Sequence, residues 1–186
     1  RRSTRRVARL SAANSSRTIL TRSTTLSFTN LKDVFMKPLV IGVVGNGFAA
    51  SFHLANYNRV YGLDIRIKGA ASRTAEGAKT FAEQHGLDQA YASVEELIAD
   101  PEINVVDLCV PNAQHHPLVI QAAEAGKDII CEKPLTGFFG DGKQESVGKE
   151  VARRDMFETA LASADAMANA VARCGVQLCY AENWIY

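Results

Sequence analysis

PLVIGVVGNGFAA, residues 38–50, is the stretch of this sequence that decides the fold. Residues 38–44 are almost entirely apolar and have the length of a buried strand. Residues 45–50 then fit the spacing G-x-G-x-x-A, and apolar residues at helical spacing continue to Tyr61. A buried strand that turns through a glycine loop into a helix is the pattern of a dinucleotide-binding turn. We therefore predict a strand, a phosphate-binding loop and a helix over residues 48–61.

The small residues of this loop have different physical tasks. Gly45 permits a tight turn, Gly47 lets the backbone approach a pyrophosphate, and Ala50 allows close packing of helix and strand. The free amides and the positive dipole end of the helix favour an anion. A plain tight turn is the alternative interpretation. We expect a cofactor phosphate on the loop residues Gly45, Asn46, Gly47, Phe48 and Ala49.

Strands and helices alternate along the rest of the chain. Strands are predicted over residues 64–71, 90–92, 105–110, 128–131 and 176–180, and helices over residues 75–85, 117–125 and 151–173, with a short helix after Ser93. Residues 137–148 are rich in glycine and charge and are predicted to form a loop. Consecutive parallel strands need crossover helices, which cover both faces of the sheet. The pattern predicts an α/β fold: a doubly wound, three-layer parallel sheet of the Rossmann type over residues 36–186.

Residues 1–35 differ in composition from the rest of the chain. They hold eight Lys or Arg and the single acid Asp33, with no sustained apolar period. We expect this basic, Ser- and Arg-rich leader to be disordered. It is interpreted as extra upstream sequence with Met36 as the natural start, or as an organellar transit peptide.

Charge and hydropathy exclude several classes of partner. Residues 36–186 hold thirteen basic and nineteen acidic side chains, a net charge of −6 that argues against nucleic acid. No apolar run is long enough to span a membrane. The cysteines lack metal-ligand spacing, so we expect no metal, reduced thiols and a cytoplasmic protein. These cysteines are Cys109, Cys131, Cys174 and Cys179.

Three further motifs follow predicted strands, where the ligand crevice of such a sheet lies. Ser72-Arg73 follows the second strand. Ser72 can donate to a ribose phosphate and Arg73 offers it a charged fork, which favours NADP over NAD. A solvated loop charge is the alternative for Arg73. The other two motifs are Val110-Pro111-Asn112-Ala113-Gln114-His115 and Glu132-Lys133-Pro134.

Together these residues resemble the glucose-fructose oxidoreductase and inositol dehydrogenase family, also called Gfo/Idh/MocA. The resemblance covers residues 36–186 and is carried by the glycine loop, Ser72-Arg73, Pro111-Asn112 with His115, Ala125-Gly126-Lys127 and Glu132-Lys133-Pro134-Leu135. It implies an oxidoreductase that moves a hydride between a CH–OH group of a sugar or polyol and NAD or NADP. Lys133 then corresponds to the catalytic lysine.

The resemblance also implies the surroundings of the cofactor. Val110, Pro111, Asn112, His115, Glu132 and the sixth-strand Asn183 correspond to residues beside it. The family's second domain supplies the substrate pocket, the partner of the lysine in proton transfer, and the homo-oligomer interface. We expect that domain to be absent here, so that this fragment binds cofactor only.

Two alternatives stay open: an NAD(P)-sensing regulator of the same fold, favoured less because Lys133 is present, and a Rossmann reductase acting on an aldehyde or cyclic imine. The remaining histidines are assigned less specific roles. His53 and His85 are interpreted as packing and helix-terminal residues.

Overall fold

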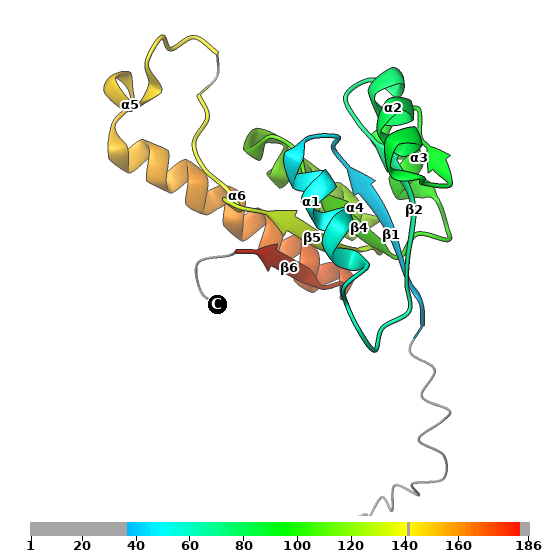
Figure 1. The fold of residues 1–186 in the computed structure, drawn as a ribbon. Helices are drawn as coiled ribbons and strands as arrows, with labels where there is room; N and C mark the ends of the chain where they lie inside the picture. The colour runs from blue at the N-terminus through cyan, green and yellow to red at the C-terminus, as the bar shows by residue number, and fades with distance from the viewer. Residues whose placement is uncertain (1–36, 141, 183–186) are drawn as a thin grey trace, which may run out of the picture. The chain divides into compact units, whose positions relative to one another are not determined.

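The computed structural model describes residues 37–140 and 142–182, and these form a sheet with helices on both faces (Figure 1). The predicted leader and Asn183 lie outside the described residues. All six strands of the sheet are parallel and stand in the order β3-β2-β1-β4-β5-β6. The strands are β1 (Leu39–Val44), β2 (Ile65–Ala71), β3 (Gln89–Ala90), β4 (Val105–Leu108), β5 (Asp128–Glu132) and β6 (Leu178–Ala181).

Helices connect each strand to the next. They are α1 (Phe48–Tyr57), α2 (Ala75–His85), α3 (Val94–Ala99), the 3-10 turn η1 (Asn112–Gln114), α4 (His115–Glu124), α5 (Val147–Glu150) and α6 (Arg153–Cys174). Among the helices of the described residues, none is both long enough and apolar enough to cross a bilayer.

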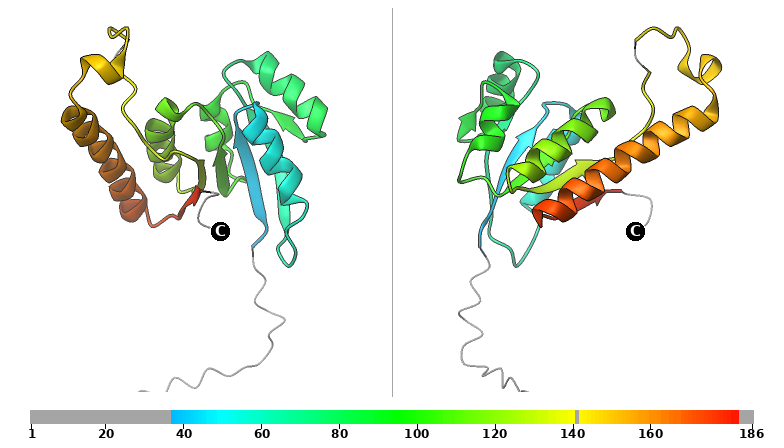
Figure 2. Two further views of the ribbon diagram at one scale, coloured as in Figure 1. Left: turned by 60° about the vertical axis from the view of Figure 1, so that its left-hand side comes forward. Right: turned by 180° about the vertical axis from the view of Figure 1, so that it is seen from behind.

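Two separate hydrophobic cores lie on the two faces of the sheet. Strand residues alternate between them, so that Ile41 and Val43 join one core and Val44 joins the other. The view from behind shows α4 and α6 over the face opposite to α1 (Figure 2). The core beneath α1 and α2 contains Ala50, Leu54 and Phe81, and the core beneath α3, α4 and α6 contains Leu97, Val119, Ala122, Met167 and Ala170. The three-layer architecture is confirmed.

The strand order reverses direction between β1 and β4. From β1 the chain builds outward to β3, and then crosses back to place β4 on the other side of β1. Helices that follow β1 and β4 therefore diverge and leave a crevice at the carboxyl ends of these two strands. This is the Rossmann arrangement that the sequence predicted.

Several element boundaries differ from the sequence prediction, among them those of α1, α4 and the loop that precedes α6. Helix α1 ends at Tyr57, before the predicted Tyr61, because Arg59 and Val60 donate their N–H groups to Asn56 and Tyr57 in tight turns. Helix α4 begins at His115 and includes Pro117 in its first turn, where a missing N–H costs no helical hydrogen bond. The loop predicted over residues 137–148 runs into the short helix α5, which begins at Val147.

Candidate functional site

A cleft of about 550 Å³ opens at the carboxyl ends of β1, β2 and β4. It therefore lies at the switch point of the strand order, where open parallel sheets bind ligands. The cleft is lined by Val44, Gly45, Asn46, Gly47, Phe48, Ala49, Ser72, Arg73, Thr74, Val94, Cys109, Val110, Pro111 and Gln114. Nine residues predicted to bind cofactor, from the glycine loop, Ser72-Arg73 and Val110-Pro111, thus share one cleft.

Gly45 is required by the fold of the chain itself. Its φ of +120° lies in a region that other residues rarely adopt, and its N–H donates to Ala71 O at 2.8 Å. A Cβ on Gly45 would lie 2.2 Å from the carbonyl oxygen of Cys109. The first glycine of the motif thus lets the loop after β1 pass against the backbone that follows β4.

Within the described residues, no backbone strain or close contact requires a glycine at position 47. Its backbone is extended, with φ −94° and ψ −168°, and a Cβ built on it would meet no atom within 4 Å. The residue nevertheless lines the cleft. The open space beside Gly47 is therefore a cradle that a side chain would fill, as expected where a ligand approaches the backbone.

The N-terminus of α1 offers unpaired donors to this cradle. Gly47 is its N-cap, no side chain of the described residues caps it, and its first turn contains no acidic residue. Helix α2, in contrast, is capped by Thr74 and has Glu76 in its first turn. Free amides together with the positive end of the helix dipole attract an anion. The loop of residues 45–49 thus fits the pyrophosphate of a dinucleotide.

Ser72 and Arg73 lie on the β2 side of the cleft and differ in whether their side-chain donors are available to a ligand. The Ser72 hydroxyl donates to Thr74 O at 2.8 Å, and the residue is buried. Its only hydrogen is therefore used by the turn, and Ser72 is a poorer phosphate donor than the sequence suggested. Arg73 is exposed and forms no ion pair with the described residues, so its guanidinium is available to a ligand.

Some residues of the motif after β4 line the cleft, and others lie in the protein interior. Val110 and Pro111 line the cleft, whereas the ring of His115 is 0% exposed. Its Nδ1 lies 3.0 Å from Pro134 O and its Nε2 lies 3.1 Å from Val110 O. His115, which we expect beside the nicotinamide, links the loops that follow β4 and β5 through these two contacts. Asn112 belongs to η1 and is not part of the cleft lining.

Lys133 lies directly after β5, the neighbour of β4 in the sheet. Its side chain is exposed and forms no ion pair with the described residues, and its peptide bond to Pro134 is cis. The backbone N–H of Lys133 donates to Glu132 Oε2 at 3.0 Å. The predicted catalytic lysine is thus held by its backbone, while its ammonium is free.

A group of polar side chains beneath the cleft was missed by sequence reasoning. Asp107, inside β4, is 0% exposed and accepts a hydrogen bond from Tyr57 Oη at 2.6 Å. The same carboxylate lies 2.9 Å from His53 Nδ1, and His53 Nε2 lies 3.1 Å from Glu132 Oε1. The sequence predicts His53 to be a packing residue. In the structure it also links the carboxylates of Asp107 and Glu132. An acid within the apolar run VVDLCV was the available signal.

Burial and the Asp107 carboxylate control the ionisation of this group. The hydrogen bond to Asp107 raises the pKa of His53 above 6.5 in spite of the opposing effect of burial, and Glu132 adds to the rise. Burial raises the pKa of the Cys109 thiol, and Asp107 raises it further. The pKa of Tyr57 is raised for the same two reasons. The tyrosine and the cysteine are thus neutral at pH 7.

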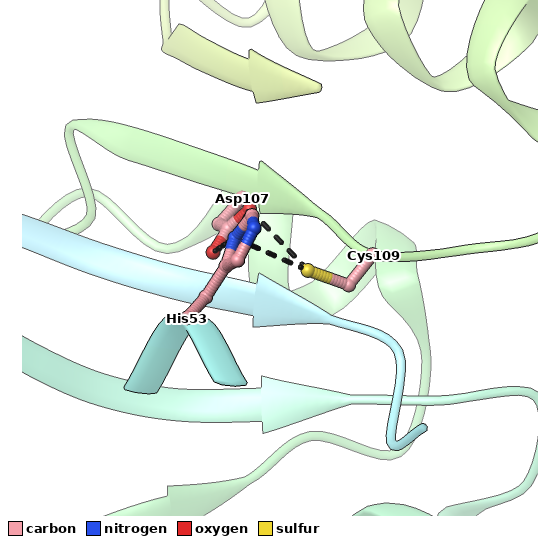
Figure 3. A group of neighbouring side chains, drawn as sticks. All are labelled: His53, Asp107 and Cys109. Atoms are coloured by element: carbon pink, nitrogen blue, oxygen red, sulfur yellow. Dashed lines mark hydrogen bonds and ion pairs between the residues drawn. The ribbon is translucent and has the colours of Figure 1, made fainter. Parts of the chain in front are cut away.

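His53, Asp107 and Cys109 each place a nitrogen, oxygen or sulfur atom within 4.8 Å of the other two (Figure 3). These atoms already form hydrogen bonds with one another: Cys109 Sγ lies 3.5 Å from His53 Nδ1 and 3.5 Å from Asp107 Oδ1. No buried side-chain polar atom of the described residues lacks a hydrogen-bond partner. The three side chains therefore form a hydrogen-bond network in which each polar atom has a partner among the described residues.

Comparison with known proteins gives a family match over the first five strands of the sheet and the cleft. Residues 39–146 match the family model Gfo/Idh/MocA, described as an oxidoreductase family with an NAD-binding Rossmann fold. The matched range contains the glycine loop, Arg73, the segment after β4 and Lys133.

Individual relatives are dehydrogenases and oxidoreductases. The chain is 37% identical over 107 residues to the levoglucosan dehydrogenase of Pseudarthrobacter phenanthrenivorans, matching 54% of this chain and 27% of that protein. It is 33% identical over 94 residues to the trans-1,2-dihydrobenzene-1,2-diol dehydrogenase of Xenopus tropicalis, 50% of this chain and 28% of that one. The crystal structure of an NAD binding oxidoreductase from Klebsiella pneumoniae superposes with a TM-score of 0.61 at 29% identity, covering 77% of this chain and 34% of that one. The chain thus spans about a third of the length of such proteins, or less.

Proposed function

Because this chain belongs to the Gfo/Idh/MocA oxidoreductase family, whose NAD-binding domain has the Rossmann fold, we propose that its cleft binds a nicotinamide dinucleotide. We propose further that the whole protein oxidises or reduces a CH–OH group of a sugar, polyol or related hydroxy compound. The relatives named above, a levoglucosan dehydrogenase and a dihydrobenzenediol dehydrogenase, support this class of substrate.

The observation that carries the binding proposal is the open cradle at Gly47. Among the described residues, no atom lies within 4 Å of where a Cβ on Gly47 would stand, and no side chain caps the first amides of α1 at the same place. Both features are explained by a pyrophosphate that takes the space and accepts from the amides.

The adenosine end of the dinucleotide would then lie beside β2. Arg73 lines that part of the cleft without an ion-pair partner among the described residues, and a guanidinium binds a phosphate by paired, charged hydrogen bonds. None of the described residues that line the cleft is acidic, so none of them repels a 2′-phosphate. These features support NADP as the preferred cofactor and NAD as the weaker one.

Lys133 is the candidate for proton transfer to or from the reacting hydroxyl. A bound nicotinamide would supply the acceptor or donor of hydride. The ammonium of Lys133 has no ion-pair partner among the described residues, so it is free to meet a substrate hydroxyl at the end of β5. No acid or base of the described residues contacts its Nζ to complete a relay. We therefore expect the 186-residue chain to bind cofactor without turnover.

The experiment that tests the binding proposal is the substitution Gly47→Asp. Asp is a better helix N-cap than Gly and tolerates the extended backbone found here, so the variant should be as stable as the parent or more stable, by about 0.5 kcal/mol. Its carboxylate would occupy the cradle and repel a phosphate. We expect NADPH affinity, measured by fluorescence titration, to fall at least about tenfold.

Gly148→Asp is the matched control, since Gly148 lies in α5 and also has open space where a Cβ would stand. This control adds the same charge and should leave NADPH affinity unchanged. If Gly47→Asp binds NADPH as tightly as Gly148→Asp, the proposed site is wrong.

A further inference from the structure

A chain of hydrogen bonds joins α1 to the turn that carries Lys133. It runs from Asp107 in β4 through the ring of His53 in α1 to Glu132 in β5, and from Glu132 to the backbone of Lys133. These residues are far apart in the sequence and meet because β4 and β5 are neighbours in the sheet. None of the three side chains lines the cleft.

Asp107 is the fixed end of this chain. Its carboxylate is 0% exposed and accepts from Tyr57 Oη at 2.6 Å and from His53 Nδ1 at 2.9 Å. A buried carboxylate is costly to leave without donors, so these bonds hold the imidazole strongly in place. The ring of Tyr57 stands edge-on to the ring of His53 at 6.3 Å and restricts it further.

Glu132 is the other end of this chain, and both of its carboxylate oxygens form hydrogen bonds. Oε1 lies 3.1 Å from His53 Nε2, and Oε2 accepts the N–H of Lys133 at 3.0 Å. Because one rigid carboxyl group makes both contacts, the position of the His53 ring limits the position of the Lys133 backbone. If His53 released Oε1, the carboxylate would be free to rotate away from the Lys133 amide.

We propose that His53 is a positioning residue that holds Lys133 in place by clamping Glu132 between its imidazole and the Lys133 backbone. The functional meaning of the clamp rests on the role proposed above for Lys133, whereas the clamp itself requires no cofactor. Its consequence is that the helix that presents amides to the cleft and the turn that presents the lysine are mechanically connected.

The charges around His53 require the ring to be cationic when the clamp is closed. The groups that face it are the Asp107 carboxylate in β4, the Cys109 thiol just after β4, the Glu132 carboxylate at the end of β5, and the Tyr57 ring on its own helix. Ionised carboxylates only accept hydrogen bonds, so a ring that contacts both must donate from both nitrogens. Loss of one ring proton would therefore open one of the two contacts.

Nuclear magnetic resonance of the ¹⁵N-labelled 186-residue chain tests the clamp without any cofactor. The His53 ring nitrogens and the Lys133 backbone amide are followed as the pH is raised. We expect both signals to change with a common midpoint. In His53→Gln, whose amide is neutral at every pH, the Lys133 amide should lose that step and exchange with solvent about fivefold faster, as expected for the loss of one hydrogen bond.

The control is His85→Gln, because His85 also contacts α1, through Ser51, but lies outside the clamp. The Lys133 step should persist unchanged in that variant. Separate midpoints in the parent chain, or a Lys133 step that survives in His53→Gln, would overturn the proposal.

Glu132→Gln gives a second route if His53→Gln fails to fold, because it keeps the shape of the side chain and removes its charge. We expect the His53 midpoint to move to lower pH and the common step to disappear from Lys133; an unchanged step would reject the clamp. Failure of the Gly47→Asp test together with success here would refute the cofactor site and leave the clamp standing.

Discussion

The two glycines of the loop should respond in opposite ways to the addition of one methyl group. Gly45→Ala places a Cβ on a residue with φ +120°, 2.2 Å from the carbonyl oxygen of Cys109. That contact is with backbone, so no flexible side chain is available to move aside. Gly47→Ala places a Cβ where no atom lies within 4 Å, on an extended backbone. We expect the first change to disrupt the fold and the second to leave it intact.

The magnitude follows from three costs at Gly45. A residue other than glycine in such a backbone region costs about 1 to 3 kcal/mol. Relief of the clash must separate the loop after β1 from the segment after β4. This separation strains the hydrogen bonds from Gly45 N to Ala71 O and from Cys109 N to Val44 O, both 2.8 Å long, at about 1 kcal/mol each. The free energy of unfolding should fall by about 3 to 5 kcal/mol.

Urea unfolding followed by circular dichroism measures this difference. A loss of that size is a large part of the roughly 5 to 15 kcal/mol that stabilises a typical domain, so the transition midpoint should fall sharply. Gly47→Ala loses only N-cap preference and should stay within about 1 kcal/mol of the parent chain. If Gly45→Ala is also within about 1 kcal/mol, the close approach at Cys109 is not what requires glycine there.

Two further predictions concern charge. Arg73→Ala should weaken NADPH binding about tenfold or more and leave NADH binding little changed, because one charged contact to the 2′-phosphate is lost; tighter binding of NADH than of NADPH by the parent chain would contradict this. Hydrogen bonds from Lys68 and Tyr91 lower the pKa of Asp100 from 3.8 to about 2. Its stabilising contribution is therefore present above about pH 3.8 and is lost as the pH falls through about 2. Asp100→Asn should reduce the loss of thermal stability in that window, and an unchanged acid profile would contradict the assignment.

Much of the fold was predictable because its signals are local. Apolar runs of strand length, the Ser93 capping box and the glycines after the helices, such as Gly86, lie within a few residues of the boundaries they determine. The predicted end of α1 was wrong because the turns after Tyr57 compete with continuation of the helix. The spacing of apolar residues does not reveal that competition. The start of α4 was placed late because Pro117 is also compatible with a first turn that begins at His115.

The candidate site was predictable only in part. The glycine loop and Arg73 gather in one cleft as expected, because each follows a strand and parallel strands end at one edge of the sheet. Lys127, noted only as part of a motif, instead donates from its buried ammonium to the carbonyl oxygens of Asp100 and Ile103, at 2.7 Å each. Its pKa is lowered by burial. Because every residue has a backbone carbonyl, the side chains of the two partners could not indicate this contact.

The sequence by itself determined the Rossmann architecture, the glycine loop and the position of Lys133 after a strand, since periodicity and turn chemistry act over short distances along the chain. Only the tertiary structure separated Gly45, which the approach of Cys109 requires, from Gly47, which the chain leaves open. It alone buried His115 and brought His53, Asp107 and Glu132 together. These outcomes depend on which strands are neighbours and how closely α1 packs on them, and such distances arise only when the sheet assembles.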